Sequence, residues 1–105
     1  MKQEVINTKK ELLQILQIQK AKILSFGVKD LSIFGSFAKD LNINKESDID
    51  FLVEFEAGKK TFDNFIDLNF FLEDITGRKV ELLTQQSLSK FIGPHIEKQL
   101  EHVNF

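Results

Sequence analysis

The chain has 105 residues, 42% of them hydrophobic, with a formal net charge of −2 and no cysteine. This length supports one modest core, so we predict a single domain over residues 1–105, with no second domain to hold a substrate. The charge excludes the excess of lysine and arginine that nonspecific nucleic-acid binding needs, and no apolar run suits a signal peptide or a membrane span. We therefore expect a cytoplasmic protein without membrane contact and without direct nucleic-acid binding.

The first predicted element is an amphipathic helix from Thr8 to about Phe26. Thr8 or Asn7 can cap its start, and Gly27 can end it. Apolar residues recur along it at helical spacing, which predicts a buried stripe made of Leu12, Ile15, Leu16, Ile23 and Phe26. The apolar segment Val28–Phe34 then predicts the first strand.

A glycine and a serine follow this strand. Gly35 lets the backbone approach a ligand closely, and Ser36 begins a predicted short helix that ends at Leu41. If Ser36 lies at the helix N-terminus, its amide and hydroxyl face an anion. Residues 42–46 are predicted to form a loop.

The second predicted strand, Ser47–Phe55, begins with carboxylates at alternate positions. Side chains alternate between the two faces of a strand, so Asp48 and Asp50 are expected on the same face, a few ångströms apart. Two like charges this close favour a hard divalent cation, typically Mg²⁺, which often completes its ligand shell with phosphate oxygens of a substrate. Together with the Gly-Ser turn, they predict a site for a metal-bound nucleoside triphosphate.

A charged turn leads to a second long helix, which Thr61 can cap and Gly77 can end. Its predicted apolar face is wide and consists of Phe62, Phe65, Ile66, Leu68, Leu72 and Ile75. Phe70 and Phe71 lie off this face. They are either half-buried or part of a surface that binds a partner.

Lys79–Leu83 is predicted to be the third strand. If it lies beside the second, Glu81 can approach Asp48 and Asp50; otherwise Glu81 is an exposed strand residue. A helical turn over residues 87–92 and a last helix from His95 to about Val103, separated by Gly93-Pro94, complete the prediction. The order α-β-α-β-α-β-α predicts an α/β domain with helices packed on a small sheet.

The central motif resembles a known signature. Gly35-Ser36, eleven intervening residues and then Asp48-Ile49-Asp50 resemble the DNA polymerase β-like nucleotidyltransferases. The short chain is similar to their minimal nucleotidyltransferase (MNT) branch, whose members often act as antitoxins beside a HEPN-domain ribonuclease toxin. This resemblance implies the nucleotidyltransferase fold with a mixed three-stranded sheet.

The resemblance also implies an activity and a set of functional residues. A member of this branch would transfer AMP from ATP, with Mg²⁺, to a hydroxyl group, by resemblance a tyrosine, of a HEPN toxin. Homo- or hetero-oligomers are compatible with such a partnership. The implied catalytic and metal-binding residues are Asp48, Asp50 and Glu81, and the implied nucleotide-binding residues are Gly35, Ser36, Lys39 and Ser47.

Three positions depart from the family pattern. Relatives usually carry arginine, often followed by glycine, where this chain has Lys39 and Asp40, and lysine lacks the bidentate fork of guanidinium. Asp40 adds a negative charge near the expected phosphates. Glu81 stands where aspartate is usual. These departures leave an alternative open, in which an inactive antitoxin neutralises its toxin by binding and occlusion.

Overall fold

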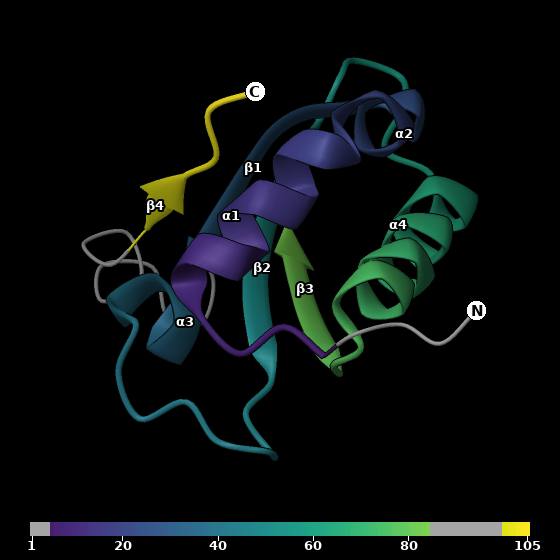
Figure 1. Cartoon of the computed structure of the whole chain (residues 1–105). Coiled ribbons are helices and arrows are strands. Elements are labelled where there is room, and N and C mark those ends of the chain that lie inside the picture. The colour runs from purple at the N-terminus through teal and green to yellow at the C-terminus, as the bar shows by residue number, and fades with distance from the viewer. Residues whose placement is uncertain (1–4, 85–99) are drawn as a thin grey trace.

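The computed structural model describes residues 5–84 and 100–105. Figure 1 shows helices packed on a small sheet. In chain order the elements are α1 (Lys9–Ile18), α2 (Lys20–Ser25), β1 (Val28–Phe34), α3 (Gly35–Lys39), β2 (Ile49–Phe55), α4 (Phe62–Thr76), β3 (Val80–Thr84) and β4 (Glu101–His102). No helix in these described ranges is long and apolar enough to cross a membrane.

Within the described residues, the sheet is mixed and has four strands in the order β3-β2-β1-β4. β2 pairs antiparallel with β1 and parallel with β3, and β4 pairs antiparallel with the other edge of β1. The predicted α/β class is confirmed, but the prediction of three strands is wrong.

The fourth strand replaces the end of the predicted last helix. The pairing of β4 continues in a hydrogen bond of 2.8 Å from the Val103 N–H to the Leu31 carbonyl. The open edge of β1 supplies hydrogen-bond partners that a helix at these residues would leave unused. The helical turn predicted over residues 87–92, and the predicted helix up to residue 99, lie outside the described residues.

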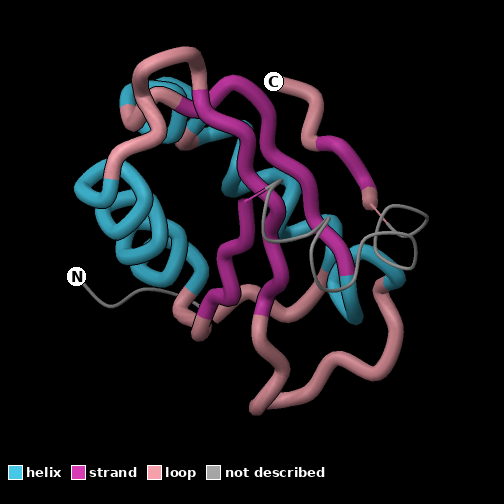
Figure 2. Tube along the Cα trace, turned by 180° about the vertical axis from the view of Figure 1, so that it is seen from behind, coloured by secondary structure: helices cyan, strands magenta, loops and turns pink. Residues whose placement is uncertain are grey.

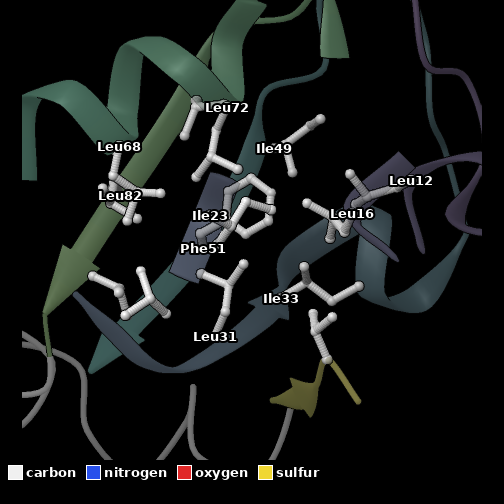
Figure 3. Close-up of a cluster of buried hydrophobic side chains, with 14 of the residues drawn as sticks. Leu12, Leu16, Ile23, Leu31, Ile33, Ile49, Phe51, Leu68, Leu72 and Leu82 are labelled. Atoms are coloured by element: carbon white, nitrogen blue, oxygen red, sulfur yellow. The ribbon is translucent and has the colours of Figure 1, made fainter. Parts of the chain in front are cut away.

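The main core lies between one face of the sheet and the helices. Figure 2 shows the opposite side, with the strands in front of α1 and α2. In the core, apolar side chains from the four helices meet those from the three longer strands. Figure 3 shows part of this cluster. The fully buried members are Leu12, Leu16, Ile23, Leu31, Ile33, Phe37, Ile49, Phe51, Leu68 and Leu72.

The single helix predicted over residues 8–26 is divided at Gln19, whose φ and ψ of −96° and 14° leave the helical region. Both halves turn apolar residues toward the core, as the stripe predicted. Thr8 caps α1 as expected, and Glu11 completes a capping box with it.

The second long helix, α4, is capped by Thr61 and followed by Gly77, whose φ is +69°. Leu68, Leu72 and Ile75 are buried as predicted. The prediction that Phe62 belongs to the same face is wrong, because 78% of this residue is exposed. At about 100° per residue, Phe62 lies at the margin of the stripe that the buried residues define.

Candidate active site

The predicted site residues gather on the face of the sheet that points away from the main core. Along β2, Phe51 and Val53 enter that core, so Asp50 and Leu52 point to the opposite face. Asp50 is paired in register with Phe34, the last residue of β1, and with Glu81 of β3. Parallel pairing in register places Asp50 and Glu81 side by side on one face.

Gly35 lies directly against Asp50. Its φ is +71°, and a Cβ atom at this position would be 2.2 Å from Asp50 Oδ2. No side chain larger than hydrogen fits there without moving the carboxylate. The sequence predicted that Gly35 permits the close approach of a ligand; in the structure, it permits the close approach of a carboxylate.

The Asp50 carboxyl has a raised pKa, because its surroundings disfavour a negative charge. Burial, the neighbouring charge of Glu81, a hydrogen bond with Glu81 and the charge of Asp48 raise the pKa of Asp50 from an ordinary value of 3.8 to about 6. A hydrogen bond between two carboxyl groups requires that one of them carries a proton. The expectation that β3 lies beside β2 and brings Glu81 to Asp50 is therefore confirmed, although the Glu81 side of the pair is exposed.

Asp48 lies just outside the strand, because β2 begins at Ile49 rather than at Ser47 as predicted. It is exposed. Its charge nevertheless acts on Asp50, as the raised pKa of Asp50 shows. The three acidic residues are thus neighbours, with Asp50 as the member that interacts with both others.

The remaining predicted residues lie around this group in different ways. Ser36 is half-buried in the first turn of α3, immediately after Gly35. The hydroxyl of Ser47 accepts a hydrogen bond of 3.0 Å from the Asn44 N–H, so it helps to shape the loop before Asp48. Lys39 is exposed at the end of α3.

Asp40 is turned toward α1. It has a left-handed backbone conformation, with φ 55°, and its Oδ1 accepts a hydrogen bond of 3.1 Å from the Lys9 N–H. The sequence suggested an unfavourable charge near a bound phosphate. The structure gives this carboxylate a partner at the start of α1 instead.

Sequence reasoning missed Arg78, the only arginine in the chain. Only 6% of it is exposed, and its guanidinium lies 5.1 Å from the centre of the Phe37 ring. It donates hydrogen bonds to the Ile6 carbonyl, to Asn7 Oδ1 at 2.9 Å, and to the carbonyls of Asn44 and Ser47, both at 2.8 Å. Arg78 therefore fixes the N-terminal segment and the loop that leads to Asp48.

A divalent cation fits the chemistry of these donors. Within residues 5–84 and 100–105, no three histidine, aspartate, glutamate or cysteine residues form a ready metal cage. Mg²⁺ does not require one, because one or two protein carboxylates plus phosphate oxygens are its usual ligands at nucleotide sites. Asp50 and Glu81 form such a pair, and a bound cation would balance the charge of the two carboxylates.

Paired carboxylates beside a Gly-Ser turn, on a small mixed sheet, define an enzyme of the nucleotidyl-transferring class. The family model described as "Nucleotidyltransferase domain" matches residues 9–103, and the chain belongs to this family. It is a nucleotidyltransferase.

Known proteins from archaea are similar over nearly the whole chain. MJ1379 of Methanocaldococcus jannaschii, named for protein adenylyltransferase activity, is 36% identical over 99 residues, which cover 91% of this chain and 94% of that protein. Protein adenylyltransferase MntA of Thermococcus cleftensis is 31% identical over 97 residues, which cover 91% and 96%.

Solved structures share the fold. A minimal nucleotidyltransferase superposes with a TM-score of 0.67 at 26% identity, covering 85% of this chain and 93% of the other. The Shewanella oneidensis complex of a tri-AMPylated HEPN toxin with its MNT antitoxin matches with a TM-score of 0.59 at 19% identity, covering 88% and 71%. The second likeness concerns the fold alone.

Proposed function

We propose that this nucleotidyltransferase is an antitoxin that transfers AMP from ATP, with Mg²⁺, to a tyrosine hydroxyl of a HEPN-domain toxin. The support for AMP and for a protein acceptor is the naming of the archaeal relatives as protein adenylyltransferases. The support for a toxin acceptor is the S. oneidensis complex, in which the HEPN toxin is described as AMPylated.

The observation that carries the proposal is the contact of Asp50 with both Glu81 and Gly35. In the reaction, the bond between the α-phosphorus of ATP and the pyrophosphate oxygen breaks, and a bond from that phosphorus to the tyrosine oxygen forms. The tyrosine proton is lost and pyrophosphate leaves. A bound Mg²⁺ ion supplies charge stabilisation for attacking and leaving oxygens.

The residues of the chain have separate roles in this proposal. Asp50, Glu81 and Asp48 would hold the cation, whose charge would balance that of the carboxylates. By the family resemblance, Gly35, Ser36, Lys39 and Ser47 would contact the triphosphate. Arg78 holds the loop before Asp48 in place.

The test is a transfer assay with the HEPN-domain toxin proposed as partner, ATP and Mg²⁺, followed by mass spectrometry of both proteins. We expect one or more AMP groups on toxin tyrosines. This chain contains no tyrosine, so any tyrosine-linked AMP in the mixture belongs to the partner. Toxin activity should stay low after the antitoxin is removed, because the added group repels RNA phosphates.

A second function is favoured by Glu81 and Asp40. Glu81 is one methylene longer than the aspartate usual in the family, and Asp40 replaces a frequent glycine in a left-handed conformation. Under this alternative, the chain inhibits its toxin only by occlusion. An unmodified toxin that recovers full activity when the complex is separated would favour occlusion over transfer.

A further inference from the structure

The outward side of α4 carries an apolar stripe that the active site does not use. Phe62, Ile66 and Phe70 follow one another at a spacing of four residues, which aligns them along one side of a helix. Phe62 is 78% exposed and Phe70 is 62% exposed, while Ile66 is half-buried. Single exposed apolar residues are common, but two largely exposed phenylalanines on one helix are typical of an interaction surface.

An acidic stripe runs beside it. Asp63, Asp67 and Asp74 are exposed on the same side of α4, and no ion pair within the described part of the chain involves them. The fifteen residues of α4 include no lysine and no arginine. We refer to these two stripes, Phe62, Ile66, Phe70, Asp63, Asp67 and Asp74, as the α4 outer face.

The α4 outer face is separate from the candidate active site. The opposite side of α4 is held in the core by Leu68, Leu72 and Ile75, so the helix lies on the core face of the sheet, beside β3 (Figure 1). Asp50 points to the other face of the sheet. Substitutions on the α4 outer face should therefore leave nucleotide binding intact.

We propose that the α4 outer face binds a protein surface that is apolar at its centre and basic at its rim, and that the toxin partner of the proposed function supplies it. This inference rests on that proposed function. A ribonuclease must bind RNA phosphates, so it presents lysine and arginine side chains, and an acidic face is complementary to them. The phenylalanines would supply the contact area, and the aspartates would supply orientation and rate of association.

Charge also argues against a second copy of this chain as the occupant. A symmetric dimer through the α4 outer face would place the same patch on both subunits. The three aspartates of one copy would then face the three of the other, and like charges brought together at an interface are unfavourable. A basic partner avoids this repulsion.

The main test compares two double variants in binding to the HEPN-domain toxin proposed as partner. Phe62→Ser with Phe70→Ser removes the apolar stripe, and the matched control, Ile18→Ser with Leu41→Ser, removes apolar residues of similar exposure, 74% and 61%, elsewhere on the surface. We expect the first to weaken binding at least thirtyfold and the second less than threefold. Equal affinities for the first variant and the wild type would overturn the proposal.

A second variant tests the charge. Asp63→Asn, Asp67→Asn and Asp74→Asn together should slow association at low salt about tenfold or more, and should flatten the dependence of the association rate on salt. An unchanged salt dependence would contradict a basic partner surface.

Self-association of the wild-type chain that is lost in the Phe62→Ser, Phe70→Ser variant would assign this face to a second copy and also overturn the proposal.

The two proposals fail in distinguishable ways. Asp50→Asn should still bind the toxin while losing transfer, and the Phe62→Ser, Phe70→Ser variant should still bind ATP with Mg²⁺. A wild-type complex that forms but yields no AMP on the toxin refutes the proposed transfer. It does not contradict the assignment of the α4 outer face as the toxin-binding surface. A complex that the Phe62→Ser, Phe70→Ser variant forms with wild-type affinity, together with normal transfer, refutes only the α4 assignment.

Discussion

At the scale of single residues, the contact between Gly35 and Asp50 is the most demanding feature of the site. Gly35→Ala should destabilise the protein by roughly 2–4 kcal/mol and abolish transfer, since it adds a steric clash with Asp50 to the strain of a positive φ. Urea unfolding followed by circular dichroism measures the first effect, and a transfer assay measures the second.

Gly58 provides the matched control. Its φ of +77° is similar, but an added Cβ would meet nothing within 4 Å. Gly58→Ala should therefore cost only the backbone strain, about 1 kcal/mol, and keep its activity. Equal effects of the two substitutions would mean that the close approach of Asp50 has no importance for the site.

Glu81 tests the third carboxylate. If it holds the cation with Asp50, Glu81→Asp should keep or raise the transfer rate, and Glu81→Ala should abolish it. Glu54, an exposed glutamate on β2, is the control for loss of a strand carboxylate. Wild-type rates for both Glu81 variants would return this residue to the role of an exposed strand glutamate.

At the scale of elements, Arg78 joins segments that are far apart in the sequence. Arg78→Ala should lower the free energy of unfolding by about 2–4 kcal/mol, because the carbonyls of Ile6, Asn44 and Ser47 lose the donor that the buried guanidinium supplies. Arg78→Lys should recover only part of this loss, since one ammonium cannot reproduce the fork. Lys79→Ala, at an exposed neighbour, should have little effect in the same unfolding measurement.

Most helices and strands could be predicted from the sequence, but the short strand β4 could not. Periodicity and capping residues located β1, α4, β3 and the start of α1 to within one or two residues, because each signal is local. The break at Gln19, which divides the first predicted helix into α1 and α2, was not predicted. β4 has two residues and depends on the open edge of β1, so no local pattern predicts it. The position of Asp50 beside Glu81 followed from strand alternation once the two strands were assumed to be neighbours.

Other features of the site depend on contacts across the chain. The hydrogen bonds of Arg78 reach residues 31 to 72 positions away, and a single arginine before a strand does not reveal them. Asp40 likewise finds its partner at Lys9, 31 residues earlier. Such contacts follow from the packing of the whole chain rather than from any local pattern.

At the scale of the whole molecule, the raised pKa of Asp50 links folding to pH. The folded state holds this proton more tightly than the unfolded chain, so the stabilising contribution is complete below about pH 3.8 and is lost as pH rises through about 6. Without metal, the wild type should lose stability relative to Asp50→Asn over this window. The difference is about 1–2 kcal/mol after allowance for solvent screening.

Thermal unfolding at pH 4.5, 5.5 and 7, followed by circular dichroism in the presence of a chelator, checks this prediction. Asp50→Asn should be at least as stable as the wild type at pH 7. Its stability should also lack the part of the pH dependence that the Asp50 carboxyl contributes in the wild type. Clear destabilisation by this substitution at pH 7 would show instead that the carboxylate supports the fold.

The burial of Arg78 also provides a way to observe unfolding. The chain contains no tryptophan and no tyrosine, so intrinsic fluorescence at the usual wavelengths cannot report on it. An arginine-selective dicarbonyl reagent has a single side chain to modify, and in the folded protein only 6% of that residue is accessible. If opening and closing are fast relative to labelling, the rate of modification reports the population of molecules in which the segments around Arg78 have separated.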